Sequence, residues 1–176
     1  TPSGPVQAMK YDRERWTAAE LKELAAHDRN GSWRLVDRSN RTPTGFPSGS
    51  NLCSLLWVYK IKRDGTYKAR LCVDGSGQQP GVDFDQTQAG TLRTLTLRCF
   101  AAIQAALHLH SARIDLVTAY LQGDLEDGEV IYARMPPGHE VIGADGQPRI
   151  CVIQKPVYGM RQAGRRLQRK LFPWMR

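Results

Sequence analysis

Residues 55–75 read LLWVYKIKRDGTYKARLCVDG, and the fold prediction starts from this stretch. Apolar and polar residues alternate on both sides of the dipeptide Asp64-Gly65. Alternation with a period of two is typical of a half-buried strand, and Asp-Gly favours the tight turn of a β-hairpin. The stretch therefore predicts two antiparallel strands joined by a short turn.

The flanking segments predict a mixture of helices and strands. Before the hairpin we expect a loose arm over residues 1–15, then a helix over 16–28 that starts at a capping box of Thr17 and Glu20, then a short strand over 32–36. After it we expect, in order, a helix over 91–110, a strand over 112–116, strands over 129–137 and 150–154, and a helix from 160 to Pro173. Helices and strands without regular alternation argue for an α+β fold rather than a doubly wound sheet.

Composition limits the class of protein. The chain has 176 residues, 41% of them hydrophobic, which suits one domain or part of a larger one. It contains neither an apolar run of membrane-spanning length nor a signal peptide, so we expect an intracellular location, in the cytoplasm or the nucleus. The four cysteines form no CxxC pair, which argues against a zinc site and for buried free thiols in a reducing compartment.

The net charge of +8 is concentrated in two groups of basic residues. One lies on the predicted hairpin and comprises Lys60, Lys62, Arg63, Lys68 and Arg70. The other lies between Lys155 and Arg176, where seven basic residues occur and no acidic one. Each group is either a solvated face or a phosphate-binding surface, since Lys and Arg displace counterions from nucleic acids.

One carboxylate stands out. Residues 113–125 read RIDLVTAYLQGDL, and Asp115 lies inside an aliphatic run. Burying a lone carboxylate among apolar neighbours is unfavourable unless it is paired or binds a metal. Asp115 is therefore a candidate metal ligand or catalytic group.

Four stretches, read together with this one, resemble the reverse transcriptase of copia-type LTR retrotransposons. They are WVYKIKRDGTYKARL, IDLVTAYLQGDL, IYARMPPG and PVYGMRQA, and GVDFDQT between the first two adds a fifth. The resemblance runs from about Trp16 to Leu171. Any one of these motifs is weak evidence, whereas five in the same order are specific.

The resemblance implies a partial polymerase right hand with fingers and an incomplete palm. Residues 16–90 would form fingers, 91–124 the start of the palm, 125–155 a second fingers hairpin, and 156–176 the return to the palm, with 1–15 as an N-terminal arm. An incomplete palm exposes an unpaired sheet edge, which invites a partner. We therefore expect a larger protein assembly that orders the chain ends.

The resemblance also implies roles for single residues. Asp115 matches the first metal-binding carboxylate, the carbonyl of Leu116 would be a further ligand, and Tyr120 matches the aromatic residue that blocks a ribose 2′-hydroxyl. Two Mg²⁺ ions would stabilise the attacking and leaving oxygens in a complete family domain. Lys62 and Arg70 match the residues that hold the incoming triphosphate.

Further positions follow from the last motif. Tyr158 and Gly159 match a turn beneath the nucleotide and the template base, where glycine permits close backbone approach. Primer–template RNA or DNA would lie against the C-terminal basic segment, contacted by Arg161, Gln162, Arg165, Arg166, Arg169 and Lys170.

The chain also departs from the family pattern. It contains no Asp-Asp pair, so the second catalytic motif, aromatic-x-Asp-Asp, is absent from it. With one such carboxylate we expect the chain alone to bind no Mg²⁺ and to extend no primer. Two functions stay open: a fragment of an RNA-directed DNA polymerase, and a domesticated, non-catalytic structural subunit of a larger assembly that contains RNA or acidic partners.

Overall fold

The computed structural model describes residues 2, 4–37 and 51–175. Three helices and five strands make an α+β fold, as expected from the sequence. The helices are α1 (Pro5–Arg29), α2 (Thr94–Ala106) and α3 (Ala163–Trp174), with short 3-10 turns η1 (Gly75–Gly77) and η2 (Ala119–Gln122). The strands are β1 (Trp33–Val36), β2 (Leu52–Ile61), β3 (Tyr67–Val73), β4 (Tyr132–Arg134) and β5 (Ile150–Ile153).

The predicted hairpin is confirmed as β2 and β3, which pair antiparallel from Leu55 opposite Val73 to Ile61 opposite Tyr67. Gly65 has a φ of 80° at the turn, a conformation that glycine adopts without steric penalty. The five strands form one sheet in the order β1-β5-β4-β2-β3, in which β2 and β4 run parallel and the other neighbours antiparallel. The hairpin therefore lies at one edge of the sheet, with β3 outermost.

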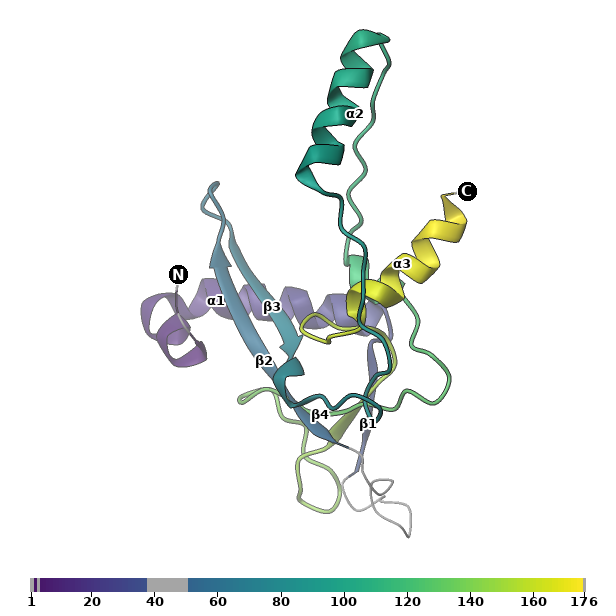
Figure 1. The fold of residues 1–176 in the computed structure, drawn as a ribbon. Helices are drawn as coiled ribbons and strands as arrows, with labels where there is room; N and C mark the ends of the chain where they lie inside the picture. The colour runs from purple at the N-terminus through teal and green to yellow at the C-terminus, as the bar shows by residue number, and fades with distance from the viewer. Residues whose placement is uncertain (1, 3, 38–50, 176) are drawn as a thin grey trace.

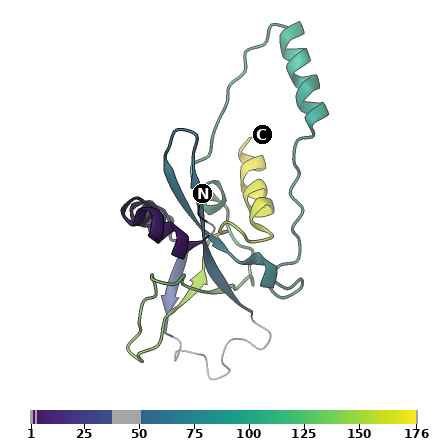
Figure 2. The same cartoon turned by 90° about the vertical axis from the view of Figure 1, so that its left-hand side faces the viewer.

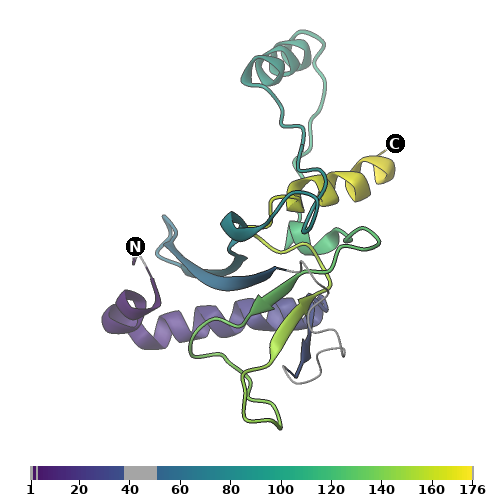
Figure 3. The same cartoon turned by 60° about the horizontal axis from the view of Figure 1, so that its bottom comes forward.

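The core lies between α1 and the inner face of this sheet. Alternate residues of β2, from Cys53 to Tyr59, are buried, as their period of two predicts. Trp16 of α1 packs edge-on against Tyr59, with ring centroids 4.9 Å apart, and against Tyr67 at 4.5 Å. Figure 3 shows α1 running beneath the sheet and across the hairpin. This packing fixes the position of α1 beside the edge strand β3.

The expected loose arm over residues 1–15 is wrong, because the chain is helical from Pro5 onward. Asp12 interrupts this helix with non-helical backbone angles, and its side chain accepts a hydrogen bond from the backbone amide of Arg15. Asp12 therefore acts as an N-cap for the second part of α1, five residues before the capping box that the sequence indicated. The polar stretch 39–51, whose Gly, Pro and Ser residues predict a loop, lies outside the described residues except for Asn51.

The predicted helix over 91–110 is present as α2, but it does not pack against the sheet. None of its residues is buried, and the large apolar side chains from Leu95 to Ile103 are more than half exposed. Figures 1 and 2 show α2 standing away from the sheet on two extended segments. The expected strand over 112–116 is wrong: these residues lie outside every helix and strand, because no neighbouring strand in the described chain pairs with them.

The thiols follow the sequence expectation only in part. Cys53 and Cys151 are buried, Cys72 is half-buried and Cys99, on α2, is exposed. None of the four forms a disulfide. In the described part of the chain, no helix combines the length and the apolar character needed to cross a membrane.

Candidate functional site

A groove of about 780 Å³ lies between α1, the edge strand β3 and the segment that precedes η2. Pockets for small ligands generally have volumes of about 300 to 1,000 Å³. Its walls come from five separate parts of the sequence, the last being Leu167 of α3. The polar and aromatic side chains that line it are Lys22, Glu23, Arg29, Lys62, Thr66, Tyr67, Lys68, Arg70, Asp115, Thr118, Tyr120 and Tyr158.

The groove is positively charged. Five basic residues line it and only two acidic ones, Glu23 and Asp115. Burial lowers the pKa of Lys68, and the nearby charge of Arg70 lowers it further. Cations that repel one another in a partly enclosed space are stabilised by an entering anion, so the groove is suited to an anionic ligand with several charges.

Two tyrosines shape one wall. The guanidinium of Arg70 lies 5.3 Å from the ring centroid of Tyr158, within the range of a cation–π contact. Tyr158 in turn meets Tyr120 edge-on, with centroids 5.0 Å apart. Burial raises the pKa of Tyr158, so its hydroxyl stays neutral at ordinary pH. The wall therefore combines a fixed cation with flat apolar rings.

Gly159 explains how this wall reaches the sheet. The backbone amide of Val73 donates a 2.7 Å hydrogen bond to the carbonyl of Tyr158, and the two segments form a bridge at Cys72. A Cβ atom on Gly159 would lie 2.1 Å from the Val73 carbonyl oxygen, and its φ is 88°. Both facts require glycine, because the backbone here lies directly against β3. The role beneath a nucleotide and template base that was expected of Gly159 stays a prediction.

Asp115 faces solvent at the mouth of the groove and is exposed. The cost of burying it among aliphatic residues therefore does not arise, because Ile114 and Val117 beside it are 75% and 80% exposed. The segment then turns sharply at Thr118, whose φ of 51° is unusual for a β-branched residue.

The residues described do not make a complete magnesium site. No three side chains of the His, Cys, Asp or Glu type form a metal-binding cluster within the described residues. Asp115 and Glu23 are the two carboxylates of the groove, and Mg²⁺ favours octahedral oxygen coordination completed by water and substrate phosphates. The groove thus offers part of a donor set for Mg²⁺.

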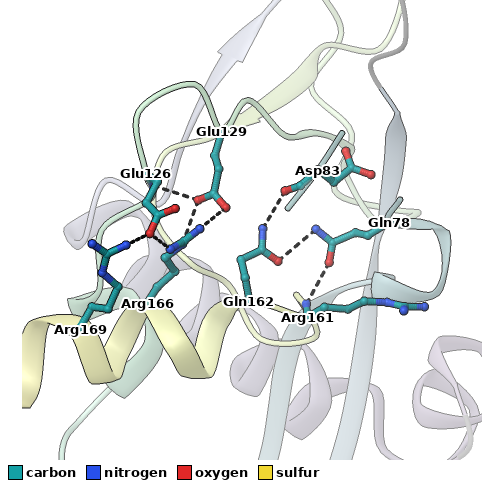
Figure 4. Close-up of polar contacts among 8 residues, drawn as sticks. All are labelled: Gln78, Asp83, Glu126, Glu129, Arg161, Gln162, Arg166 and Arg169. Atoms are coloured by element: carbon teal, nitrogen blue, oxygen red, sulfur yellow. Dashed lines mark hydrogen bonds and ion pairs between the residues drawn. The ribbon is translucent and has the colours of Figure 1, made fainter. Parts of the chain in front are cut away.

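The second basic group, between Lys155 and Arg176, lies outside the groove. Arg166 of α3 is 2% exposed. It donates two hydrogen bonds to Glu129, from Nε to Oε2 at 3.0 Å and from Nη2 to Oε1 at 2.6 Å. Glu126 pairs with both Arg166 and Arg169 (Figure 4). A single upstream carboxylate, Asp124, pairs with two lysines of this group: 2.5 Å to Lys155 and 2.7 Å to Lys170.

These pairs change the interpretation of the C-terminal basic segment. Four of its seven basic residues have carboxylate partners within the chain. A hydrogen bond from Lys155, and then one from Lys170, hold the pKa of Asp124 below its usual value. Arg166 is enclosed and cannot face nucleic acid in this conformation. The segment therefore forms an ion-paired clamp that fastens α3 to residues 124–129.

Gln162 is also enclosed, with 0% exposure. Its side-chain amide donates a 3.0 Å hydrogen bond to the Asp83 carbonyl and accepts one from Gln78 at 3.3 Å (Figure 4). The Gln78 side chain accepts a 2.9 Å hydrogen bond from the backbone amide of Arg161, whose guanidinium donates to the Gly75 carbonyl at 2.8 Å. Gln162 thus joins α3 to the loop after β3, and its buried side chain presents nothing to a template strand.

The structure therefore divides the residues that the sequence singled out. Six of them line the one groove: Lys62, Arg70, Asp115, Leu116, Tyr120 and Tyr158. Gly159 supports its wall, whereas Arg161, Gln162, Arg165, Arg166, Arg169 and Lys170 lie on or before α3 and are absent from the lining. The roles of all these residues remain predictions.

Sequence reasoning missed Lys22, Glu23 and Arg29, which α1 contributes to the groove. Their place in the groove depends on the packing of α1 against β3, which no local pattern indicates. Sequence reasoning also missed the partners of α3. The acidic stretch GDLEDGE at residues 123–129 could have indicated these partners, because its charge is opposite to that of α3.

The chain is similar to known proteins over most of its length. The family described as "Reverse transcriptase (RNA-dependent DNA polymerase)" matches residues 31–174. The chain is 34% identical over 163 residues to the retrovirus-related Pol polyprotein from transposon TNT 1-94 of Nicotiana tabacum. The matched region covers 90% of this chain and 11% of that protein. It is 32% identical over 168 residues to the Pol polyprotein from transposon RE2 of Arabidopsis thaliana, with 93% and 11% covered.

The chain thus spans about 11% of the length of these relatives. No solved structure gives a significant match. The family match covers most of the described structure, including the hairpin, the groove wall at Tyr158 and the clamp on α3. The chain therefore belongs to the reverse transcriptase (RNA-dependent DNA polymerase) family, and its relatives are Pol polyproteins of copia-type retrotransposons.

Proposed function

We propose that the chain is the fingers and partial palm of an RNA-directed DNA polymerase, and that its groove binds the triphosphate of an incoming nucleotide. The observation that supports this is the convergence of Lys62, Arg70, Asp115, Tyr120 and Tyr158 on one groove, although they come from three distant parts of the sequence. A cationic groove of this size matches the charge of a triphosphate.

The proposed roles follow the family pattern. Lys62 and Arg70 hold the phosphates, and a guanidinium suits this because it can donate two parallel hydrogen bonds to phosphate oxygens. Asp115 and the Leu116 carbonyl would face the Mg²⁺ that accompanies the nucleotide. The Tyr120 ring would exclude a ribose 2′-hydroxyl, and Tyr158 with Gly159 would lie beneath the base.

Primer–template RNA or DNA is the proposed second ligand. We place its phosphates mainly on the hairpin, because Lys60, Lys62, Arg63 and Lys68 have no carboxylate partner among the described residues. Arg161 and Arg165 are the residues before the clamp that could extend this surface. Arg166 and Gln162 would instead hold the supporting loops in place.

The proposed function is tested by nucleotide binding. With a deoxynucleoside triphosphate and Mg²⁺, Arg70→Ala and Lys62→Ala should each weaken binding by about tenfold or more, since hydrogen bonds to charged groups contribute roughly 1.5 to 3 kcal/mol. Lys60→Ala is the matched control, because Lys60 lies two residues before Lys62 and is absent from the groove lining. Equal effects of all three substitutions would contradict a triphosphate site in the groove.

The alternative is a structural subunit that binds nucleic acid without catalysis. The exposed apolar side chains of α2 favour this alternative, because a protein partner would bury them. Primer extension tests whether the chain is itself a catalyst. We expect no extension by this chain with Mg²⁺ and deoxynucleotides, and Asp115→Asn should then leave folding intact. Extension that is lost in Asp115→Asn would show that the chain is itself a catalyst.

A further inference from the structure

The groove has a second row of cations, which comes from α1. The residues of α1 that line it are Ala19, Lys22, Glu23, Ala26 and Arg29. Their spacing places them on one face of the helix, and the small side chains of the two alanines leave room between the charged ones. Lys22 and Arg29 precede residues 31–174, the part of the chain that the family matches, and the proposed function gives them no role.

Lys22 lies at the level of Arg70. The residue after it, Glu23, accepts a hydrogen bond from the backbone amide of Leu71, which fixes the position of α1 along β3. Arg70 directly precedes Leu71 in β3, and both Lys22 and Arg70 line the groove. Figure 3 shows α1 passing across the hairpin, so the two cations come from different layers of the fold. At this level the groove therefore has one cation on each side.

Arg29 lies at the other end of the groove, beside η2. The side chain of Asn30, which follows Arg29, accepts a 3.4 Å hydrogen bond from Gln122 of η2. Tyr120 of the same turn lines the groove together with Arg29. A helix rises 1.5 Å per residue, so the backbones of Lys22 and Arg29 are about 10 Å apart along the axis. The cations of α1 thus extend along the groove instead of gathering at one point.

Neither cation is paired within the described chain. Lys22 and Arg29 are exposed, and no carboxylate of a described residue forms an ion pair with either of them. On α3, by contrast, Arg166 and Arg169 both contact carboxylates. Unpaired cations on two sides of a groove repel one another, and an anion that enters between them is attracted by both sides.

We propose that Lys22 and Arg29 bind phosphate oxygens from α1 while the cations of the hairpin bind them from the other side, so that a polyphosphate chain bridges the two walls. The inference rests on the proposed function, because it requires phosphates to enter the groove. Ammonium and guanidinium groups donate charge-assisted hydrogen bonds to phosphate, which are stronger than neutral ones. The helix before the family match thereby becomes part of the ligand site.

Calorimetric titration with inorganic triphosphate, in EDTA and about 0.15 M salt, tests the inference without metal. Lys22→Gln and Arg29→Gln should each weaken binding by about three- to tenfold, the loss expected from one charge-assisted hydrogen bond. Lys22→Arg and Arg29→Lys keep the positive charge and the donors, so each should retain most of the wild-type affinity.

Lys10→Gln and Arg13→Gln are the matched controls, because they remove the same charges from exposed positions of α1 that are absent from the groove lining. Both should bind within about twofold of wild type, since salt at this concentration screens charges beyond about 8 Å. Thermal melts establish that each variant is folded, and alanine, the best helix former, replaces glutamine in a variant that is not. If Lys22→Gln and Arg29→Gln bind triphosphate as tightly as the two controls, the inference is overturned.

Arg70→Ala distinguishes this failure from failure of the proposed function. If binding depends on Arg70 but on neither Lys22 nor Arg29, the groove binds phosphate from the hairpin alone and only the inference is wrong. If all three substitutions leave triphosphate binding unchanged, or if the wild-type chain does not bind it, the proposed site is wrong and the inference falls with it. Losses confined to the two α1 variants would overturn the bridge and assign phosphate binding to α1 alone.

Discussion

The hairpin and α3 contain the two basic groups of the sequence, and the structure treats them in opposite ways. On the hairpin, Lys62, Lys68 and Arg70 border a groove and form no ion pair among the described residues. On α3, Arg166 and Arg169 are paired with Glu126 and Glu129. Similar runs of positive charge therefore leave unpaired cations beside a groove in one region and attach a helix in the other.

The difference comes from where the carboxylates lie. An edge strand such as β3 has one neighbouring strand, β2, and the charges that the two present outward have the same sign. The helix α3 packs on η2 and on the acidic stretch that follows it, so its cations meet anions at close range. Net charge along the chain does not distinguish these cases, because the partner residues are about forty positions away in sequence.

The comparison predicts that substitution of Arg166 has the largest effect on stability. Arg166→Ala should lower the free energy of unfolding by about 3 to 5 kcal/mol, because it leaves Glu129 buried without its partner. Lys170→Ala, on the same helix but 52% exposed at its side chain, should cost less than about 1 kcal/mol. Urea unfolding of both variants measures the difference.

The double variant Arg166→Met with Glu129→Met sharpens this result. Replacing a buried pair by apolar side chains is often close to neutral, so the double variant should recover most of the stability lost in Arg166→Ala. If Arg166→Ala is no more destabilising than Lys170→Ala, α3 is not held by a buried ion pair, and its arginines would again be candidates for nucleic-acid binding.

A second prediction concerns acid, which should affect α1 before it affects the clamp. His27 is 1% exposed, and its pKa of about 4 in the folded chain lies below the ordinary value of about 6.5. Between these two values the unfolded chain binds the extra proton, so stability should fall as pH drops from about 6.5 to 4, by roughly 3 kcal/mol. His27→Gln should flatten this dependence.

Unfolding in urea at pH 7.5, 5.5 and 4.5 measures the effect. The pKa of Asp124 is held below its usual value by the hydrogen bonds from Lys155 and Lys170, so its contribution to the clamp is lost only as pH falls below about 4. A pH dependence that persists unchanged in His27→Gln would assign the acid sensitivity to another group.

The third prediction compares the two basic regions directly. Affinity for single-stranded RNA should fall with salt, and the triple variant Lys60→Gln, Lys62→Gln, Arg63→Gln should flatten the log–log slope by up to about 2, at roughly 0.7 per phosphate contact. The pair Arg169→Gln and Lys170→Gln should change the slope little, because both residues already have carboxylate partners. Equal flattening per charge in the two variants would remove the distinction between the regions.

Local patterns predicted the parts of the fold that depend on neighbours in sequence. The hairpin follows from alternation and one Asp-Gly turn. Ile150–Ile153 was recognised as a strand because it is an apolar stretch that follows the turn at 143–149. The strand expected around Asp115 failed, because a strand requires a hydrogen-bonded neighbour and apolar residues alone do not provide one. The start of the second part of α1 was misplaced, because Asp12 and Thr17 both have the chemistry of an N-cap.

The site was predicted where motifs of fixed spacing identified it and missed where contacts are long-range. Lys62, Arg70 and Tyr158 were found from two motifs, and they line one groove. Glu23 was not found, because its significance depends on the packing of α1 against β3. Arg166 was found but given a role at the surface, since its burial depends on an acidic loop folded against it.

The smallest effect is expected at Arg70, which makes it the counterpart of Arg166. Arg70 is exposed, has no carboxylate partner among the described residues, and contacts Tyr158 through its guanidinium at 5.3 Å. Surface substitutions generally change stability by less than about 0.5 kcal/mol, and an exposed cation–π contact adds about as much. Arg70→Ala should therefore lower the free energy of unfolding, measured in urea, by no more than about 1 kcal/mol. The double variant Arg70→Ala with Tyr158→Leu should lose less stability than the sum of the two single variants. A loss of stability in Arg70→Ala comparable to that in Arg166→Ala would mean that the hairpin too is held by its charges. The groove cations would then stabilise the fold and would not be free to bind a ligand.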